Sequence, residues 1–235
     1  MENIEKCLQK VERYLGQHPD TDDETVTLLR ELYRVCRQLH DQATIDFLTG
    51  LYNRRAFEQQ LELAVERARR ERSIFSLILA DLDHFKRIND LYGHLVGDEV
   101  LRKVGQLIRS TFRKVDFPAR YGGEEFAVIL PGTGFEGALS AAWRLKKRVE
   151  ETNFGDPAQP IRLTTSIGLG TYRPLEGLNA KEFLEKVDHF LYAAKNRGRN
   201  VIVYESDRSF PERHLEGLSH EEKKTLMEGV RSYDD

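Results

Sequence analysis

An almost unbroken apolar run at residues 75–82 constrains the fold of this 235-residue chain more than any other feature. A strand that is apolar without alternation is typical of a sheet covered on both faces, because a half-exposed strand would alternate polar and apolar side chains. The run ends in Asp81-Leu82-Asp83. It therefore predicts a central strand between two layers of helices, with carboxylates at the point where the strand ends.

Helix and strand patterns alternate around this run, from residue 46 to residue 204. Apolar side chains at three- and four-residue steps predict helices, and short apolar runs predict strands. The alternation predicts one α/β domain with helices around a central sheet. Helices are expected at residues 56–72, 97–112, 135–152 and 180–196, a hairpin at residues 119–131, and strands at residues 163–172 and 201–204.

Residues 1–45 are predicted to be helical only. Apolar spacing indicates one helix at residues 4–15, and a Thr21–Glu24 capping box indicates the start of a second. An apolar stripe runs along this second helix. Its two heptads do not distinguish a helix that packs on its own domain from one that binds a second copy or a partner. The stripe consists of Leu29, Leu32, Cys36, Leu39 and Ala43.

Residues 205–235 are polar, with one short predicted helix that starts at a capping box between Ser219 and Glu222. The two cysteines, Cys7 and Cys36, lie in helical sequence without metal-ligand spacing. We therefore expect reduced thiols that are buried as small apolar side chains, and neither a disulfide nor a zinc site.

The charge balance and hydropathy exclude several classes of protein. The chain has 36 Lys and Arg against 39 Asp and Glu, so it lacks the cationic excess by which nucleic-acid-binding proteins release phosphate counterions. No window approaches the roughly 18 apolar residues of a membrane span, and the N-terminus mixes both charges where a signal peptide has an apolar core. We expect a cytoplasmic protein with no nucleic-acid or membrane partner.

The end of the central strand has the chemistry of a magnesium site. Asp81 and Asp83 would point to the same face of the strand, and the Leu82 carbonyl is a further oxygen, so hard ligands would lie beside a substrate phosphate. Lys86 and Arg87 are placed to meet phosphates. Lys195 and Arg199 would share one helical face if their helix extended that far, and would offer further cations. Solvated carboxylates at a strand end and a solvated helix end are the alternatives.

A purine-reading pair and a glycine hairpin accompany these charges. Asn89 and Asp98 fit guanine, because a carboxylate accepts from its N1–H and exocyclic amine, and adenine offers no such pair of donors. Gly93 and Gly97 between them fit turns, and simple helix punctuation is the alternative for each. The glycines of residues 120–126 fit a two-residue hairpin that needs positive φ, and the absence of side chains there would let a triphosphate or metal approach the backbone.

Four segments together closely resemble the GGDEF family of diguanylate cyclases. They occur in the family's order and spacing, over residues 46–204. The resemblance implies a palm-like α+β fold with a mostly antiparallel central sheet ringed by helices, and the condensation of two GTP into cyclic di-GMP and two pyrophosphates. The segments are 46–57 (DFLTGLYNRRAF), 81–98 (DLDHFKRINDLYGHLVGD), 120–126 (RYGGEEF) and 191–200 (LYAAKNRGRN).

The resemblance also implies roles for individual residues. The Asp81 carboxylate, the Leu82 carbonyl and Glu124 would bind two Mg²⁺ ions per site, with Mn²⁺ as a substitute. Glu124 would also act as, or near, the base for the 3′-hydroxyl, with Glu125 in support, and Lys86 would stabilise transition-state charge. Substrate binding would involve Asn89, Asp98 and His94 at the nucleoside and Phe85, Lys86, Lys195 and Arg199 at the phosphates.

Regulation follows from the same resemblance. One such domain holds one GTP, so a two-fold symmetric product implies a homodimer or higher homo-oligomer with facing sites. Arg113 and Asp116 occupy the place of the family's inhibitory RxxD site, and Arg144 could supply its additional arginine, so cyclic di-GMP is expected to inhibit. Residues 1–41 match no sensor module that we can name. A separate activator protein, or self-association, is therefore expected to act through the N-terminal helices.

The chain departs from the family at residues 187–190, where Val-Asp-His-Phe replaces a small Ala-Asp-x-Ala pattern. This departure suggests an altered packing face or a partner surface.

The expected organisation is a dimerisation or partner-binding segment at 1–45, a cyclase domain at 46–204 and a tail at 205–235. The alternative function is a catalytically silent receptor for GTP or cyclic di-GMP that signals through its N-terminal helices. The complete set of polar site residues argues against a mere dimerising scaffold.

Overall fold

A computed structural model describes residues 2–17, 24–205 and 230–232. The chain divides into two compact units, Met1–Ile45 and Asp46–Asp235. The predicted capping boxes at Thr21 and Ser219, with the short helix after Ser219, lie outside the described residues. Within the described part, no helix is both long and apolar enough to cross a bilayer.

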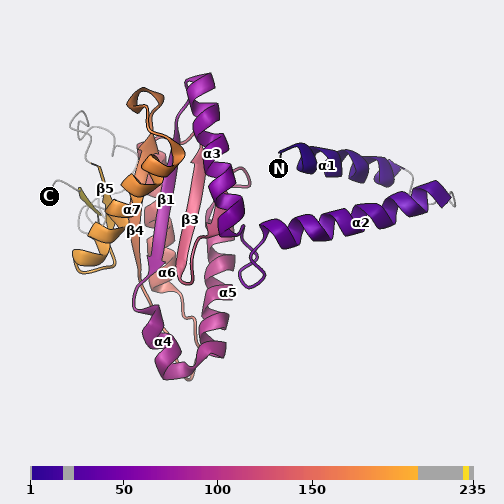
Figure 1. The fold of residues 1–235 in the computed structure, drawn as a ribbon. Coiled ribbons are helices and arrows are strands. Elements are labelled where there is room, and N and C mark those ends of the chain that lie inside the picture. Colours follow the sequence, from indigo (N-terminus) through magenta and orange to yellow (C-terminus); the bar gives the residue numbers. More distant parts are fainter. Residues whose placement is uncertain (1, 18–23, 206–229, 233–235) are drawn as a thin grey trace. The chain divides into compact units, whose positions relative to one another are not determined.

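The first unit is a pair of helices, α1 (Glu2–Gln17) and α2 (Glu24–Thr44), that pack against each other (Figure 1). Leu8 of α1 and Val26 of α2 are buried. The prediction of two helices in this segment is confirmed. The prediction of buried thiols is wrong, because Cys7 and Cys36 are free but exposed.

An apolar face of α2 remains exposed. Leu29 of the predicted stripe is half-buried, whereas Leu32, Cys36 and Leu39 are exposed. Packing against α1 therefore covers one side of the helix and leaves a second apolar side open. The large apolar side chains on that open side are 55–66% exposed and consist of Leu28, Leu32, Val35 and Leu39.

The second unit contains a six-stranded sheet in the order β2-β3-β1-β4-β5-β6. The central strand β1 is antiparallel to β3 and β4, β2 is antiparallel to β3, and β5 and β6 extend the sheet in parallel. The predicted α/β class with a mostly antiparallel sheet is thus confirmed. The strands are β1 (Phe75–Leu82), β2 (Phe117–Arg120), β3 (Glu125–Pro131), β4 (Thr165–Tyr172), β5 (Ile202–Tyr204) and β6 (Val230–Ser232).

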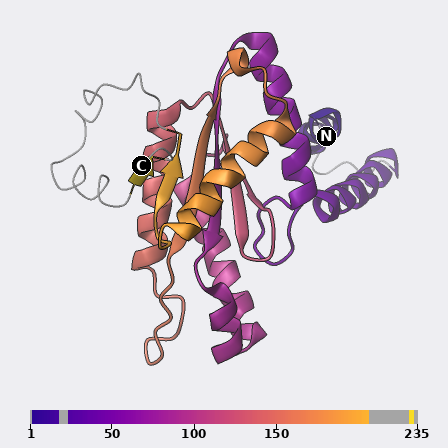
Figure 2. The ribbon, with the colours of Figure 1, turned by 60° about the vertical axis from the view of Figure 1, so that its left-hand side comes forward.

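Helices cover both faces of this sheet (Figures 1 and 2). Alternate residues of β1 enter two separate cores: Leu77 and Leu79 pack under α3 and α7, and Ile78 packs on the opposite face with α5 and α6. This explains why the strand is apolar along its whole length, since every residue of β1 is buried. The elements outside the sheet are α3 (Arg54–Glu71), α4 (Phe85–Tyr92), α5 (His94–Thr111), α6 (Phe135–Glu151), the 3-10 turn η1 (Pro174–Glu176) and α7 (Ala180–Asn196).

The family-atypical residues of α7 are packing residues. Val187 and Phe190 are buried, and Phe190 forms a small cluster with Val201 and Val203 beside β5. Gly170 of β4 leaves the space that the Val187 side chain fills, since a Cβ on Gly170 would lie 2.5 Å from Val187 Cγ2. Val187 and Phe190 are therefore used in packing within the domain, and these two side chains are not available as a partner surface.

Candidate active site

The three predicted metal ligands come together where β1 meets the β2–β3 hairpin. Asp81 is opposite Glu125 in the antiparallel register, and the Leu82 amide donates to the Glu124 carbonyl at 3.2 Å. Asp81 is 6% exposed, and its Oδ2 accepts a hydrogen bond from Lys195 Nζ at 2.7 Å. The sheet thus brings the carboxylates of Asp81 and Glu124 and the ammonium of Lys195 together at the end of β1.

The electrostatics of this cluster suit a cation. Burial raises the pKa of Asp81, against the lowering effect of the Lys195 ammonium. Burial also raises the pKa of Glu124, and the neighbouring Asp81 charge raises it further. Crowded, partly desolvated carboxylates of this kind are stabilised in their charged form by a bound divalent ion.

The donor set fits Mg²⁺ only if the backbone takes part. Among the described residues, no three His, Cys, Asp or Glu side chains lie close enough to hold a metal by themselves. Asp81 and Glu124 supply two carboxylates, and a carbonyl at the end of β1, such as that of Leu82, supplies a third oxygen. Mg²⁺ is commonly held by one or two carboxylates together with substrate phosphate and water, so the residues present fit this ion.

Asp83 has a different task from Asp81. Its Oδ1 accepts from Ser166 Oγ at 2.6 Å, and its Oδ2 accepts from Thr164 Oγ1 at 2.6 Å and from the Asn200 amide at 3.0 Å. These bonds join the end of β1 to β4 and to the loop after α7. Asp83 is therefore an anchor of the site, and its oxygens are already used by the protein.

Arg120 connects the hairpin to the beginning of the domain, a link that the sequence alone did not indicate. Its guanidinium donates to the carbonyls of Gly122 and Gly123 and forms an ion pair with Asp46 at 3.3 Å. Both charged side chains are 16% exposed. Asp46 also accepts from the Thr49 hydroxyl at 2.7 Å, so a single arginine ties the 46–49 turn to the carboxylate hairpin.

The expectation of positive φ in the hairpin is wrong. Positive-φ glycines occur elsewhere in the described residues but not at Gly122 or Gly123. Gly122 is needed for a different reason, because a Cβ there would lie 2.4 Å from Glu125 Oε2. The Glu125 side chain therefore folds back over the glycine and brings its carboxylate close to the backbone of the hairpin.

The two guanine-reading candidates lie on neighbouring helices, α4 and α5. Asn89 is half-buried, and its Oδ1 is a buried atom with no hydrogen-bond partner within the described residues. Asp98 is partly exposed on α5. Gly97 lies inside α5, and not in a turn as expected, while Gly93 separates the two helices with φ +82°. An unsatisfied buried carbonyl is costly unless a ligand supplies a donor.

The residues predicted to bind the phosphates differ in how far their side chains are exposed. Phe85 is 4% exposed, so only its backbone at the first turn of α4 can face a ligand, whereas Lys86 and His94 are exposed. Lys195 and Arg199 do not share a helical face, because the helix does not extend as far as Arg199. Helix α7 ends at Asn196, and Arg199 lies exposed in the following loop with φ +63°.

The predicted inhibitory site is a compact loop between α5 and β2. Asp116 Oδ2 accepts from the Arg113 amide at 2.7 Å. Burial raises the pKa of Asp116, and the bond and charge of Arg113 and the charge of Arg144 lower it. Arg144 is exposed on α6, so the structure brings these three residues into one electrostatic neighbourhood.

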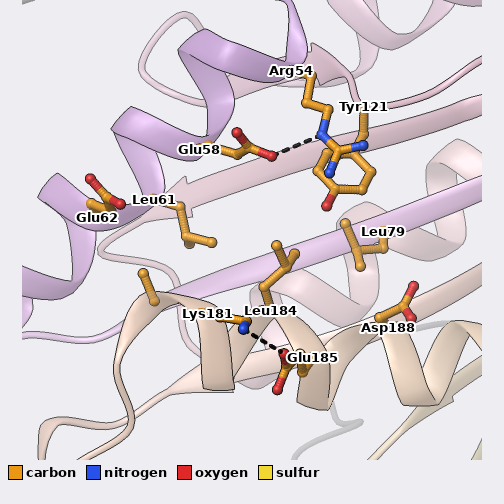
Figure 3. A pocket seen from close by; sticks show the side chains of 11 residues that line it. Arg54, Glu58, Leu61, Glu62, Leu79, Tyr121, Lys181, Leu184, Glu185 and Asp188 are labelled. Carbon is orange, nitrogen blue, oxygen red and sulfur yellow. Dashed lines mark hydrogen bonds and ion pairs between the residues drawn. The ribbon is translucent and has the colours of Figure 1, made fainter.

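A separate groove of about 400 Å³ lies between α3 and α7 (Figure 3). Its floor is apolar, with Leu61, Leu79 and Leu184, and its rim carries ion-paired charges such as Arg54 with Glu58 at 2.8 Å. The predicted metal ligands do not line it.

Comparisons with known proteins agree with this arrangement. A family described as "Diguanylate cyclase, GGDEF domain" matches residues 43–201. The response regulator PleD of Caulobacter vibrioides is 41% identical over 163 residues, which cover 68% of this chain and 36% of PleD, so the chain spans about a third of that relative.

Solved structures also resemble the chain. The coiled coil and GGDEF domain of DgcB from Caulobacter crescentus, in complex with c-di-GMP, has a TM-score of 0.72 at 30% identity over 77% of this chain and 95% of that chain. The diguanylate cyclase SiaD from Pseudomonas aeruginosa, in complex with its activator SiaC, has a TM-score of 0.66 at 30% identity over 85% and 77% of the two chains. With a family match over more than half of its length, the chain belongs to the GGDEF family of diguanylate cyclase domains.

Proposed function

We propose that the chain condenses two GTP into cyclic di-GMP and two pyrophosphates. The observation that carries this proposal is the cluster of Asp81 and Glu124 at the end of β1, close in sequence to the orphaned Asn89 carboxamide of α4. A metal-binding carboxylate pair and a purine-reading amide are the two parts that a cyclase of this kind needs together. Family membership supports the same reaction.

The residues of the chain then divide the work. Asn89 and Asp98 hold guanine, with His94 near the nucleoside, while Lys86, Arg199 and the Phe85 backbone bind phosphate oxygens. Lys195 leaves Asp81 to join the phosphates when substrate arrives. Glu124, with its raised pKa, takes the proton of the 3′-hydroxyl or orients it, and Glu125 supports the hairpin. Bound Mg²⁺ would activate the nucleophile and neutralise the leaving pyrophosphate.

Incubation of the purified chain with GTP and Mg²⁺, followed by chromatography of the nucleotides, tests this proposal. The wild type should form cyclic di-GMP, and Glu124→Gln should form at least about a hundred-fold less, because it loses a ligand and the base. Glu136→Gln, on the outer surface of α6, is the matched control. Absence of product from the wild-type dimer, with cyclic di-GMP or GTP still bound, would favour the receptor function instead.

We further propose that a second copy of the chain docks on the exposed apolar side of α2. Leu28, Leu32, Val35 and Leu39 are spaced 4-3-4, the a/d spacing of a two-helix seam. The reaction needs two facing GTP sites, and α2 leads directly into Asp46 at the start of the catalytic domain. A seam on α2 would therefore hold two catalytic domains near each other.

Leu32→Glu tests the seam. The variant should be monomeric by light scattering and should lose most of its cyclase activity at low protein concentration. Leu175→Glu is the control, because Leu175 is fully exposed on η1, far from α2 in sequence. A Leu32→Glu variant that remains a fully active dimer would contradict the proposed seam.

Two regulatory features complete the proposal. Product would bind at Arg113, Asp116 and Arg144 and inhibit, so Arg113→Ala should remain active at cyclic di-GMP concentrations that stop the wild type. A separate activator protein would act through α1 and α2, as the SiaD complex with its activator SiaC suggests for a similar chain. Unchanged specific activity and oligomeric state after deletion of residues 1–40 would contradict a regulatory role of these helices.

A further inference from the structure

A glycine lies where a helix would normally have a side chain. Gly97 is the fourth residue of α5 (His94–Thr111) and is buried. Glycine is the poorest helix former after proline, because it loses the most backbone entropy when the helix forms. A buried glycine in the first turns of an 18-residue helix therefore needs a specific reason.

The reason is the side chain of Asn89. A Cβ built on Gly97 would lie 1.9 Å from Asn89 Oδ1 and 3.1 Å from Asn89 Cγ. The ring of Phe85 closes another side of the same space, with its Cζ 3.3 Å from that Cβ position, and Phe85 is 4% exposed. Because the phenylalanine is fixed in the core, a methyl group at position 97 could be accommodated only if the Asn89 carboxamide moved.

We infer that Gly97 is a positioning residue for guanine recognition, because it provides the space that holds the Asn89 carboxamide against α5, at the residue that precedes Asp98. This inference rests on the proposed function of Asn89 and Asp98 and deepens it. The Asn89 Oδ1 atom is buried without a partner in the described structure. When a guanine edge binds, this oxygen and the amide group beside it gain hydrogen-bond partners. The carboxamide can form these bonds only if the protein holds it in the right position.

The position of the carboxamide matters for base selectivity in particular. An amide that donates and accepts at fixed positions distinguishes guanine from adenine only while its two ends stay in register with the base edge. Phosphate binding depends on other residues, such as Lys86 and Lys195. A displaced Asn89 should therefore weaken binding of the guanine base and leave binding of the phosphates unchanged.

Binding of GDP and ADP to the Gly97→Ala variant tests the inference without turnover. By calorimetry in Mg²⁺, GDP affinity should fall about ten-fold, as expected for the loss of one or two neutral hydrogen bonds. ADP affinity should be unchanged, so the preference for guanine should fall by the same factor. The melting temperature should stay equal or rise, because alanine favours helix. In steady state, KM for GTP should rise more than kcat falls.

A double-variant cycle separates positioning from general damage. In an Asn89→Ala background the carboxamide is absent, so adding Gly97→Ala should cause no further loss of GDP affinity. Gly137→Ala in α6 is the matched control, since its Cβ would meet only Thr133 Cγ2 at 3.0 Å. It should leave both nucleotide affinities unchanged.

Three results would overturn the inference. These are an unchanged guanine preference in Gly97→Ala, an equal loss of GDP and ADP affinity, and losses that add in the double variant. A wild type that binds GDP no better than ADP would also overturn it. Failure of the proposed function is a different result: guanine-selective binding that depends on Gly97, without formation of cyclic di-GMP, would leave the inference standing and remove the cyclase.

Discussion

The packing of α7 on β4 depends on a close fit between Gly170 and Val187. A Cβ on Gly170 would lie 2.5 Å from Val187 Cγ2 and 3.4 Å from Phe183 Cε2. Carbon atoms in protein cores are separated by about 3.5–4.0 Å, and the Val187 side chain is fully buried. Gly170→Ala therefore requires α7 to move away from the sheet, and with it Lys195 in the last turn of α7.

The sign and size of the effect follow from this geometry. Overpacking by one methyl group in a close-packed core costs about 1–3 kcal/mol. Without the clash, Gly170→Ala would instead stabilise the folded protein by about 0.4–1 kcal/mol, because alanine reduces the conformational entropy of the unfolded chain. Val187→Ala removes two buried methyl groups and should cost about 1.5–2 kcal/mol. In the double variant the methyl group at position 170 enters the vacated space, so the double variant should be at least about 1.5 kcal/mol more stable than the sum of the single effects.

Urea unfolding, followed by far-ultraviolet circular dichroism, measures these differences. Gly168→Ala is the matched control in the same strand, because its Cβ would meet the Leu191 amide and the Val187 carbonyl, both at 2.5 Å. These are backbone atoms, so Val187→Ala should not relieve that variant. The reasoning is refuted if Gly170→Ala is neutral or stabilising, or if Val187→Ala rescues both glycine variants equally.

Three further predictions concern the site. Burial and a neighbouring carboxylate raise the pKa of Glu124. The contribution of this carboxyl to folding stability is therefore fully present at low pH, where it is protonated, and is lost as the pH rises through the raised pKa. Glu124→Gln should therefore raise the melting temperature of the metal-free protein at pH 7.5, by an amount that shrinks toward pH 4 in thermal melts. Arg120→Lys should lower cyclase activity about ten-fold, because one ammonium cannot hold Asp46 and two hairpin carbonyls together; activity equal to wild type would contradict this. Trp143, the single tryptophan of the chain, precedes Arg144 of the proposed inhibitory site in α6. Its fluorescence should therefore change when cyclic di-GMP is titrated in, and Arg144→Ala should remove this response; an unchanged response in the variant would contradict the proposed site.

The parts of the fold that sequence patterns predicted are those with strong local periodicity. Strand β1 and helix α7 have the predicted bounds, because a fully buried strand and an amphipathic helix with a capping Asn179 carry their own signals. Helix α4 has only eight residues and β6 only three. Elements so short are formed by packing and pairing: Phe85 and Ile88 anchor α4 in the core, and neighbouring residues do not predict this.

Patterns also failed where one element has two apolar sides. The predicted stripe of α2 combined residues from both, because helical periodicity does not indicate which side a neighbouring helix covers. Cys36 was assigned to the core for this reason and is exposed. Glycine presented a similar ambiguity. Gly122 and Gly97 were both interpreted as turn residues, whereas each allows a distant or folded-back side chain to approach the backbone.

The division of labour between Asp81 and Asp83 shows what only the folded chain contains. The two carboxylates are equivalent in the sequence, and the difference comes from partners 81, 83 and 117 positions away from Asp83. In Asp83→Asn, one carboxamide oxygen remains to accept hydrogen bonds from the Thr164 and Ser166 hydroxyls and the Asn200 amide. The new NH₂ group faces at least one of these donors. Each lost bond to a buried group costs about 1–3 kcal/mol, so the variant should unfold at a clearly lower urea concentration than wild type.

Asp81→Asn should behave in the opposite way. It removes the cluster's central negative charge and one ion pair with Lys195, but burial already opposes that charge, so the loss of stability should be the smaller of the two. Mg²⁺ should then fail to stabilise Asp81→Asn in thermal melts with a GTP analogue, and should still stabilise the folded fraction of Asp83→Asn. Equal losses of stability in the two variants would contradict this difference in roles. Loss of the Mg²⁺ effect in Asp83→Asn alone would show that the roles of the two aspartates are reversed.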